Sequence, residues 1–480
     1  MPKLPNILYI LADDMGYGDI TCFNPNCKAP TPVLDRMAAE GMRFTDSHTS
    51  SAVCTPTRYS IITGRYNWRS WMQQGVLTGE SPFLPEADRP TAASLLKAHG
   101  YATACIGKWH LGLGWRDLDG NRFGHDANDW SCAAATRIDY AKGVTEGPNS
   151  VGFDYSFIIP SSLDIPPYVY LENHRCTAIP TEENMIGVDT PYLMRRGMAA
   201  PGLQAVDVLP TFTAKVCAKI DEYAAGDKPF FIYFPLSAPH TPIVPASAYR
   251  GRTEIGLYGD FVTQIDAIVG EVLATLEANG LADNTLVVFT SDNGASPAAK
   301  LGELFLLGHE PNRPWRGHKA DLYEGGHRTP LIARWPGVVA PGSVCDQTIC
   351  TTDLLATLAE ITGTTLPENG GEDSYSLLPL LRGDAIAGDF REATVHHSVS
   401  GHFAIRQGSW KLLEAKGSGG WSFPKEAEAK DWPIPPVQLY DLARDPGETT
   451  NLALACPDKV AELQALLNRY RTEPRSAPRG

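Results

Sequence analysis

Short apolar runs alternate with helical patterns along the first 360 residues, and this alternation limits the fold more than any other feature of the chain. The runs that read as buried strands are residues 6–12, 101–106, 230–234, 286–289 and 331–335. The helical patterns between them cover residues 32–40, 92–99, 210–225, 258–279 and 352–362. Continuous apolar strands separated by helices predict a layered α/β domain with a parallel or mixed sheet.

The pattern changes after about residue 380. Short candidate antiparallel strands appear at residues 393–397, 402–406, 410–413 and 438–442, and residues 457–471 form an amphipathic helical pattern. A chain of 480 residues is long enough for two or three domains, at about 150 residues each. We therefore predict a catalytic domain over residues 1–380 and a small α+β domain over residues 381–480.

Polar side chains follow the predicted strands at the point where each strand ends. They are Asp13 and Asp14, Lys108 and His110, His240, and Asp292 and Asn293. Active sites of α/β sheets lie at the carboxyl ends of the strands, so these side chains are expected to meet. Either Asp-Asp or Asp-Asn-Gly alone would more often make a turn. Together they offer the oxygen ligands that a hard cation requires.

The segment Cys54-Thr55-Pro56-Thr57-Arg58 is expected to open a helix beside this site. Thr55 can cap the helix, Pro56 suits its first position and Arg58 then falls in the first turn. An anion beside Cys54 would meet free N–H groups, the positive end of the helix dipole and a guanidinium. A buried cysteine before an ordinary helix is the alternative that this segment alone leaves open.

This segment, followed by T-G-R at residues 63–65, resembles the signature of type I sulfatases, the arylsulfatase-like, formylglycine-dependent family of the alkaline phosphatase superfamily. Three further blocks resemble that family and occur in its order: G-K-W-H-L-G at 107–112, A-P-H-T-P at 238–242 and R-G-H-K-A-D-L-Y-E-G-G-H-R at 316–328. The resemblance spans about residues 5–340 and implies the alkaline phosphatase-like fold, in which helices sandwich a large, mixed, mostly parallel sheet. Thr57 stands where the family often has serine, and it keeps the hydroxyl.

The resemblance implies that a formylglycine-generating enzyme converts Cys54 to formylglycine, whose hydrate is the nucleophile. It also implies one divalent cation, Ca²⁺ first and Mg²⁺ as the alternative. The implied ligands are Asp13, Asp14, Asp292, Asn293 and modified Cys54.

The remaining implied roles concern sulfate and protons. Lys108, Lys319 and Arg58 would contact the sulfate, and His110 would be the base near the aldehyde hydrate. His240 would protonate the leaving alcohol. Glu324 and Arg328 are expected to orient their loop.

Charge and composition exclude several classes of protein. The net charge of −14 repels nucleic acid and anionic membranes, and no apolar run reaches the roughly 20 residues of a bilayer span. Residues 1–5 lack a signal-peptide layout, so we expect a cytoplasmic protein or one whose leader was removed. Ten cysteines without C-x-x-C pairs, nine of them besides Cys54, favour a reducing compartment.

We expect the substrate to be a sulfated carbohydrate, because long polar and aromatic loops over residues 112–206 can contact sugar rings. Candidates for the pocket wall are Asp164, Tyr168, His174, Arg175, His309, Arg313 and His402. His396, His397 and His402 are expected to close the rim. The alternatives are a phosphate or phosphonate ester hydrolase of the same fold, and a glycan-binding protein without catalysis.

Overall fold

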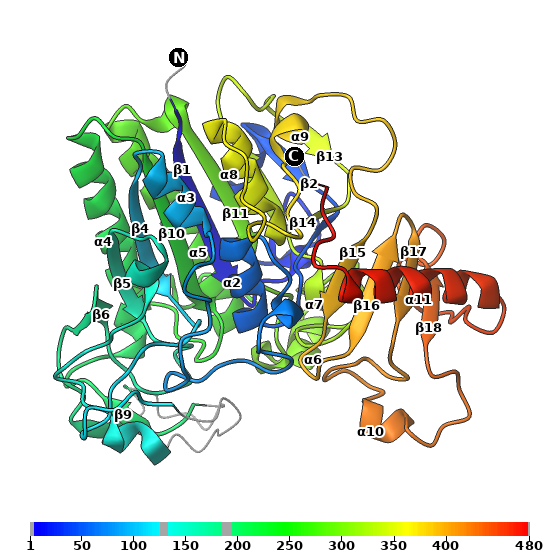
Figure 1. Cartoon of the computed structure of the whole chain (residues 1–480), viewed down its shortest axis with the longest axis horizontal. Helices are drawn as coiled ribbons and strands as arrows, with labels where there is room; N and C mark the ends of the chain where they lie inside the picture. The colour runs from blue at the N-terminus through cyan, green and yellow to red at the C-terminus, as the bar shows by residue number, and fades with distance from the viewer. Residues whose placement is uncertain (1–3, 125–132, 185, 187–193, 479–480) are drawn as a thin grey trace.

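The computed structural model describes residues 4–124, 133–184, 186 and 194–478, and a ten-stranded sheet dominates it (Figure 1). The strand order is β13-β2-β12-β11-β1-β10-β4-β5-β6-β7. In that order the strands span Ser343–Cys345, Met42–Phe44, Leu331–Arg334, Thr285–Ser291, Asn6–Asp13, Phe230–Pro239, Ala102–Lys108, Tyr155–Ile159, Leu171–Glu172 and Arg175–Cys176. The central five, β11 to β5, are parallel, whereas β12, β6 and β7 introduce antiparallel pairs. The predicted mixed, mostly parallel sheet is confirmed.

Helices cover both faces of this sheet, so its central strands are buried on both sides (Figure 1). Along β1, Leu8 and Ile10 pack into one hydrophobic cluster with the helices Ala205–Ala224 and Leu257–Ala278. Ile7 and Tyr9 pack into the other cluster with the helices Cys54–Thr63, Ala92–Ala98 and Leu354–Thr362. Successive side chains of a strand point to opposite faces, which explains why the run is apolar throughout. The helices are α1 (Pro32–Ala39), α2 (Cys54–Thr63), α3 (Ala92–Ala98), α4 (Ala205–Ala224), α5 (Leu257–Ala278), α6 (Leu301–Leu306), α7 (Glu324–His327), α8 (Leu354–Thr362) and α9 (Leu378–Arg382).

A four-stranded antiparallel sheet with a covering helix stands beside the large sheet (Figure 1). Its strands are β15 (Thr394–His397), β16 (Phe403–Gln407), β17 (Trp410–Leu413) and β18 (Gln438–Asp441). Helix α11 (Pro457–Thr472) places Leu463, Leu467 and Tyr470 against this sheet, and a short helix α10 (Glu426–Ala429) precedes β18. The predicted C-terminal strands and amphipathic helix are therefore present.

The structure adds elements that periodicity did not predict. Strand β5 (Tyr155–Ile159) belongs to the large sheet although it lies in the stretch predicted as loops. Two-stranded pairs join β14 (Ile349–Cys350) to β3 (Ser47–His48) and β8 (Glu182–Asn184) to β9 (Gly197–Ala199). These strands have two to five residues, too few for an alternating pattern to stand out. Part of the predicted loop stretch, including Cys132, lies outside the described residues.

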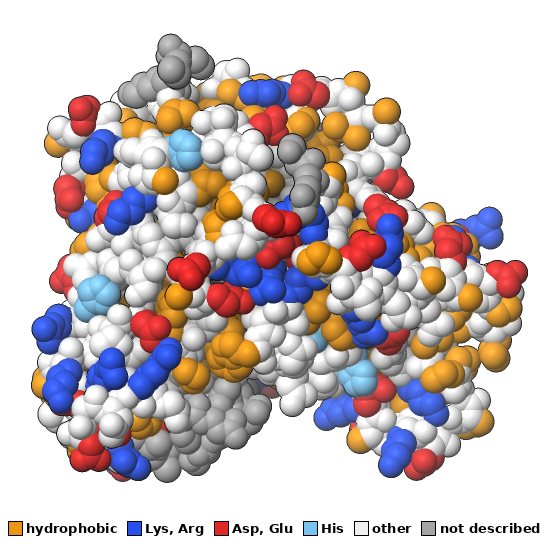
Figure 2. Space-filling model, viewed as in Figure 1, with side chains coloured by type: hydrophobic (Ala, Val, Ile, Leu, Met, Phe, Trp, Pro, Cys, Tyr) orange, Lys and Arg blue, Asp and Glu red, His pale blue; other side chains and the backbone are white. Residues whose placement is uncertain are grey.

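Within the described ranges, no helix is long and apolar enough to cross a membrane. All nine cysteines in those ranges are free. Acidic and basic side chains alternate with apolar ones over the face shown in Figure 2. The negative net charge is thus not gathered into one patch on that face.

Candidate active site

Helix α2 carries Cys54 into the interior. All ten of its residues are buried, and the helix begins at Cys54 itself, with Val53 in an extended conformation as its N-cap residue. The prediction that Thr55 caps the helix is wrong: its hydroxyl accepts a hydrogen bond from the backbone N–H of Leu77 at 3.2 Å. Arg58 is accordingly the fifth residue of the helix rather than the third, so it lies in the second turn and not in the first. Cys54 remains at the helix N-terminus, so its side chain still meets the positive end of the dipole.

The acidic residues converge because β1 and β11 are parallel neighbours in register. Ala12 pairs with Ser291, which places Asp13 and Asp14 beside Asp292 and Asn293. The backbone N–H of Asp14 donates to Asp292 Oδ1 at 3.1 Å, and Asn293 Nδ2 donates to Asp14 Oδ1 at 2.7 Å. Asp14 has a φ of +65°, a conformation that few non-glycine residues adopt and that is common at functional sites.

Three buried cations compensate these carboxylates. Lys108 Nζ donates to both oxygens of Asp13 at 2.8 Å, and Lys319 Nζ lies 2.6 Å from Asp14 Oδ1. Arg58 donates to Asp292 Oδ2 through Nε at 3.0 Å and Nη2 at 2.7 Å, and its Nη1 donates to the Lys108 carbonyl. Burial would raise the pKa of Asp13, but Lys108, followed by His240, Arg58 and Lys319, holds it well below its usual value. The cations thus keep a buried carboxylate ionised.

Cys54 lies between the carboxylates and Lys319. Its Sγ is 3.7 Å from Asp13 Oδ1, and Lys319 Nζ donates to Sγ at 3.4 Å. Burial raises the pKa of the Cys54 thiol to about 12; Lys108 and Lys319 oppose the shift, and Asp292 and Asp13 add to it. The unmodified side chain is therefore a thiol at neutral pH and a weak nucleophile.

Each of the two predicted histidines binds a backbone carbonyl through one ring nitrogen, which leaves its other ring nitrogen available. His110 Nε2 donates to the Leu77 carbonyl at 2.7 Å, which leaves Nδ1 as a buried acceptor with no partner among the described residues. Burial, with Lys108 and Arg58 nearby, lowers the pKa of His110 well below its usual value, so the ring is neutral. His240 Nδ1 donates to the Thr241 carbonyl at 2.6 Å, and its Nε2 lies 3.7 Å from Asp14 Oδ2.

The predicted ligand set fits a hard cation. Asp14 Oδ2 and Asn293 Oδ1 are buried and accept no hydrogen bond from the described residues. Asp13, Asp14, Cys54 and His240 offer ligand atoms within 4.8 Å of one another. Buried, unsatisfied oxygens beside two further carboxylates are the environment that Ca²⁺ or Mg²⁺ stabilises. His240 joins this group although the sequence indicated only a proton-transfer role.

Among the predicted wall residues, Asp164 lies nearest to this constellation within the described part of the chain: its Oδ1 is 3.9 Å from His240 Nδ1. Tyr168 is buried and donates to the Arg195 carbonyl, and His309 is buried with its Nε2 2.8 Å from Asp19 Oδ1. Arg313 pairs with Glu310. His174 and Arg175 are exposed, and His402 is half-buried beside the Glu414 carbonyl.

The prediction that His396 and His397 close the rim is wrong, because both are buried. His396 stacks on His327 with ring centroids 3.7 Å apart, and its Nδ1 donates to the Thr49 carbonyl. His397 lies against Trp68 and Phe403. Two adjacent histidines in a short strand have the same sequence pattern whether they lie at the rim of a pocket or in the protein core.

Around His396, a buried ionic cluster joins the loop of Lys319 to the C-terminal sheet. Glu324 pairs with Arg328 at 3.1 Å, Arg406 at 3.4 Å and Lys411 at 2.9 Å, and Lys411 also pairs with Glu448 at 2.9 Å. Its charges come from segments far apart in sequence, so no local motif could have indicated it. Glu324 and Arg328 both belong to this cluster, and their role in orienting the loop stays a prediction.

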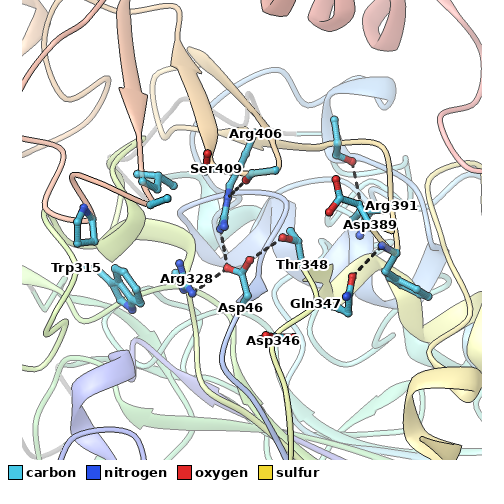
Figure 3. A pocket seen from close by; sticks show the side chains of 16 residues that line it. Asp46, Trp315, Arg328, Asp346, Gln347, Thr348, Asp389, Arg391, Arg406 and Ser409 are labelled. Carbon is cyan, nitrogen blue, oxygen red and sulfur yellow. Dashed lines mark hydrogen bonds and ion pairs between the residues drawn. The ribbon is translucent and has the colours of Figure 1, made fainter. Parts of the chain in front are cut away.

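A cavity of about 460 Å³ opens between the large domain and the C-terminal sheet (Figure 3). Its arginines are already paired: Arg328 and Arg406 with Asp46 at 3.0 and 2.6 Å, and Arg391 with Asp353 at 3.0 Å. The cavity therefore offers no uncompensated cation for an anion. None of the predicted catalytic or metal-binding residues lines it.

Comparison with known proteins points to one family. Residues 5–364 match the family model Sulfatase, and residues 317–473 match the model described as N-sulphoglucosamine sulphohydrolase, C-terminal. N-acetylgalactosamine-6-O-sulfatase of Bacteroides thetaiotaomicron is 33% identical, over 98% of this chain and 93% of the relative, and human arylsulfatase A is 32% identical over 96% and 87%. A structure solved in a study of glycosaminoglycan metabolism by Bacteroides thetaiotaomicron covers 98% of this chain and 100% of its own, with a TM-score of 0.83 and 30% identity.

Proposed function

The chain belongs to the sulfatase family and is a sulfuric ester hydrolase, and from this premise we propose that it removes sulfate from a sulfated carbohydrate through a formylglycine formed at residue 54. One observation carries the proposal. Cys54 stands at a helix N-terminus between Asp13 and Lys319, within a buried set of three cations and three carboxylates. A sulfate ester needs such a set, because its transferring group is anionic while its nucleophile must be activated.

In the proposed reaction, His110 Nδ1 accepts a proton from one hydroxyl of the hydrated aldehyde at residue 54. That oxygen forms a bond to sulfur as the bond from sulfur to the alcohol oxygen breaks. Lys108 and Lys319 stabilise the sulfuryl oxygens, and His240 donates a proton to the leaving alcohol. The second hydroxyl then gives its proton to His240, which became neutral when it protonated the alcohol, the C–O bond to sulfate breaks, and the aldehyde reforms for rehydration. The proton held by His110 leaves with the sulfate or passes to solvent, which returns both histidines to their starting states.

A divalent cation held by Asp13, Asp14, Asp292, Asn293 and modified Cys54 would supply Lewis-acid stabilisation to the site, Ca²⁺ being the first candidate. Arg58 supports this assignment by holding Asp292 in place with two hydrogen bonds. We infer that Arg58 acts mainly on the ligands, in addition to the sulfate contact expected from sequence.

The carbohydrate part of the proposal rests on the relatives. N-acetylgalactosamine-6-O-sulfatase of Bacteroides thetaiotaomicron aligns with nearly the whole chain. We therefore propose N-acetylgalactosamine 6-sulfate as the first compound to test, ahead of aryl and steroid sulfates.

The test has two measurements. Mass spectrometry of protein made with a formylglycine-generating enzyme is expected to show the peptide of residue 54 lighter than encoded by about one water molecule. Turnover is then compared on N-acetylgalactosamine 6-sulfate, other sulfated sugars, an aryl sulfate, a steroid sulfate and an aryl phosphate, with Cys54→Ala as the inactive control. Full activity of a wholly unmodified Cys54 protein would contradict the mechanism. A preference for phosphate would favour the alternative hydrolase, and a preference for steroid or aryl sulfate would overturn the carbohydrate assignment alone.

A further inference from the structure

Asp164 presents a buried carboxylate oxygen that nothing in the catalytic scheme uses. The residue is 8% exposed, and Oδ1 accepts no hydrogen bond from the described residues. That oxygen lies 3.9 Å from His240 Nδ1, beyond hydrogen-bonding distance, and His240 Nδ1 already donates to the Thr241 carbonyl. A buried, unsatisfied carboxylate oxygen is costly, so its retention beside a reactive group calls for a partner.

The other atoms of Asp164 are held in place, which fixes the direction of the free oxygen. Arg195 Nη1 donates to Asp164 Oδ2 at 3.1 Å, and the Arg195 backbone N–H donates to the Asp164 carbonyl at 3.1 Å. Tyr168 in turn donates its hydroxyl to the Arg195 carbonyl. A carboxylate clamped at one oxygen has little rotational freedom left, so binding a ligand at the other costs little ordering entropy.

We propose that Asp164 is a specificity-determining residue, whose Oδ1 accepts a hydrogen bond from a ring hydroxyl of the sugar that carries the sulfate ester. This deepens the proposed function and rests on it, because His240 is assigned there to the leaving oxygen. A donor within reach of both His240 and Asp164 belongs to the same sugar unit as the ester. An alcohol without that donor would leave the carboxylate buried and unpaired.

The experiment measures three ligands on two enzymes. N-acetylgalactosamine 6-sulfate is compared with its 3-deoxy and 4-deoxy analogues, on the wild type and on Asp164→Asn. On the wild type, kcat/KM for one of the two deoxy analogues is expected to be about 10- to 150-fold lower than for the parent sugar, the range for a hydrogen bond to a charged group. On Asp164→Asn, the same analogue is expected to lose much less relative to the parent sugar. Asp227→Asn, an exposed carboxylate between α4 and β10, is the matched control and keeps the wild-type ratio.

Calorimetric binding of the same ligands to Cys54→Ala, with and without Asp164→Asn, separates this inference from the proposed function. If the loss of affinity for one deoxy analogue depends on Asp164, but the protein with residue 54 intact hydrolyses none of the sulfated sugars, the role of Asp164 is retained and the proposed reaction is overturned. If Asp164→Asn weakens the sugar and both deoxy analogues by equal factors, Asp164 acts through His240 or on stability and the proposal is overturned. Equal binding of all ligands to Cys54→Ala would overturn it as well. Thermal unfolding of each variant identifies any loss of fold.

Discussion

At the scale of single residues, the candidate active site pairs buried carboxylates with buried cations. Asp13, Asp14 and Asp292 face Lys108, Lys319 and Arg58, and each pair is shielded from water. Such pairs contribute little net stability, but removing one partner is expensive because the other stays buried and uncompensated. The constellation is therefore sensitive to any change that removes one charge.

Removing the divalent cation is expected to abolish turnover and to lower the melting temperature, because a ligand bound only by the folded state stabilises it. Asn293→Asp, which keeps an oxygen at this position, should retain more metal affinity than Asn293→Leu. Calorimetric Ca²⁺ titration and thermal unfolding after chelation check this. Unchanged activity after exhaustive chelation, or stoichiometric zinc in the purified protein, would contradict the metal assignment.

Arg58→Met is expected to destabilise the chelated protein by about 3–5 kcal/mol, because Asp292 loses both hydrogen bonds and remains buried. Added Ca²⁺ should reduce this loss by compensating the same carboxylate. Urea unfolding with and without Ca²⁺ measures both effects. Arg122→Met is the control: its salt bridge to Glu146 is exposed to solvent, so the expected loss is about 1 kcal/mol or less. Equal losses for the two variants would argue against the role of Arg58.

At the scale of elements, close backbone approaches bring the site loops together. Gly294 follows the Asp292–Asn293 pair, and a Cβ built on it would lie 1.8 Å from the carbonyl oxygen of Gly325. The backbone N–H of Gly294 also donates to the Gly326 carbonyl at 3.0 Å. Only glycine allows the metal-ligand loop to pack directly on the Gly325-Gly326 turn, a few residues beyond Lys319.

Gly294→Ala is thus expected to cost about 1–3 kcal/mol or more through overpacking, and to reduce turnover by shifting Asn293. Gly302→Ala in α6 is the matched control, since its Cβ would meet no atom within 4 Å and alanine favours helices by up to about 1 kcal/mol. Denaturant unfolding and kcat/KM report both effects. A Gly294→Ala protein as stable and active as the wild type would disprove the packing argument.

At the scale of the molecule, the buried ionic cluster ties the two sheets together. Glu324 lies on the loop of the large domain that carries Lys319, whereas Lys411 and Glu448 come from the C-terminal part. The family model for the C-terminal region begins at residue 317, before this loop ends. The domain division at residue 380 stays a prediction, and these contacts favour mutual dependence of the two parts.

Glu448 provides a pH test of this junction. Burial raises its pKa to about 7; Lys411 opposes the shift and Glu324 adds to it. A carboxyl with a raised pKa stays protonated in the folded protein after it has ionised in the unfolded chain. Its contribution to stability therefore falls as pH rises from about 4.5 to about 7 and levels off above.

Glu448→Gln is expected to remove this part of the pH dependence. Free energies of unfolding measured between pH 4.5 and 8 check it, and Glu277→Gln, an exposed carboxyl on α5, is the control that should keep the wild-type slope. An unchanged slope in Glu448→Gln would show that Glu448 titrates normally.

The sequence by itself determined the fold class, the long strands and helices, and the type of each candidate site residue. The reason is that periodicity and strand-end chemistry are local: β1 is apolar at every position because both of its faces are covered, and the polar residues begin where it ends. Motif order added Cys54 and Lys319, which no periodicity brings together.

Only the tertiary structure decided how these residues meet. Strand order and register bring Asp13 beside Asp292, helix α2 begins at Cys54 rather than after Thr55, and His396 is inside rather than at the rim. The Arg195 clamp that leaves one oxygen of Asp164 free is likewise invisible in the sequence. These features depend on contacts between residues far apart in the chain, and burial of a polar group is set by what packs against it rather than by its neighbours in sequence.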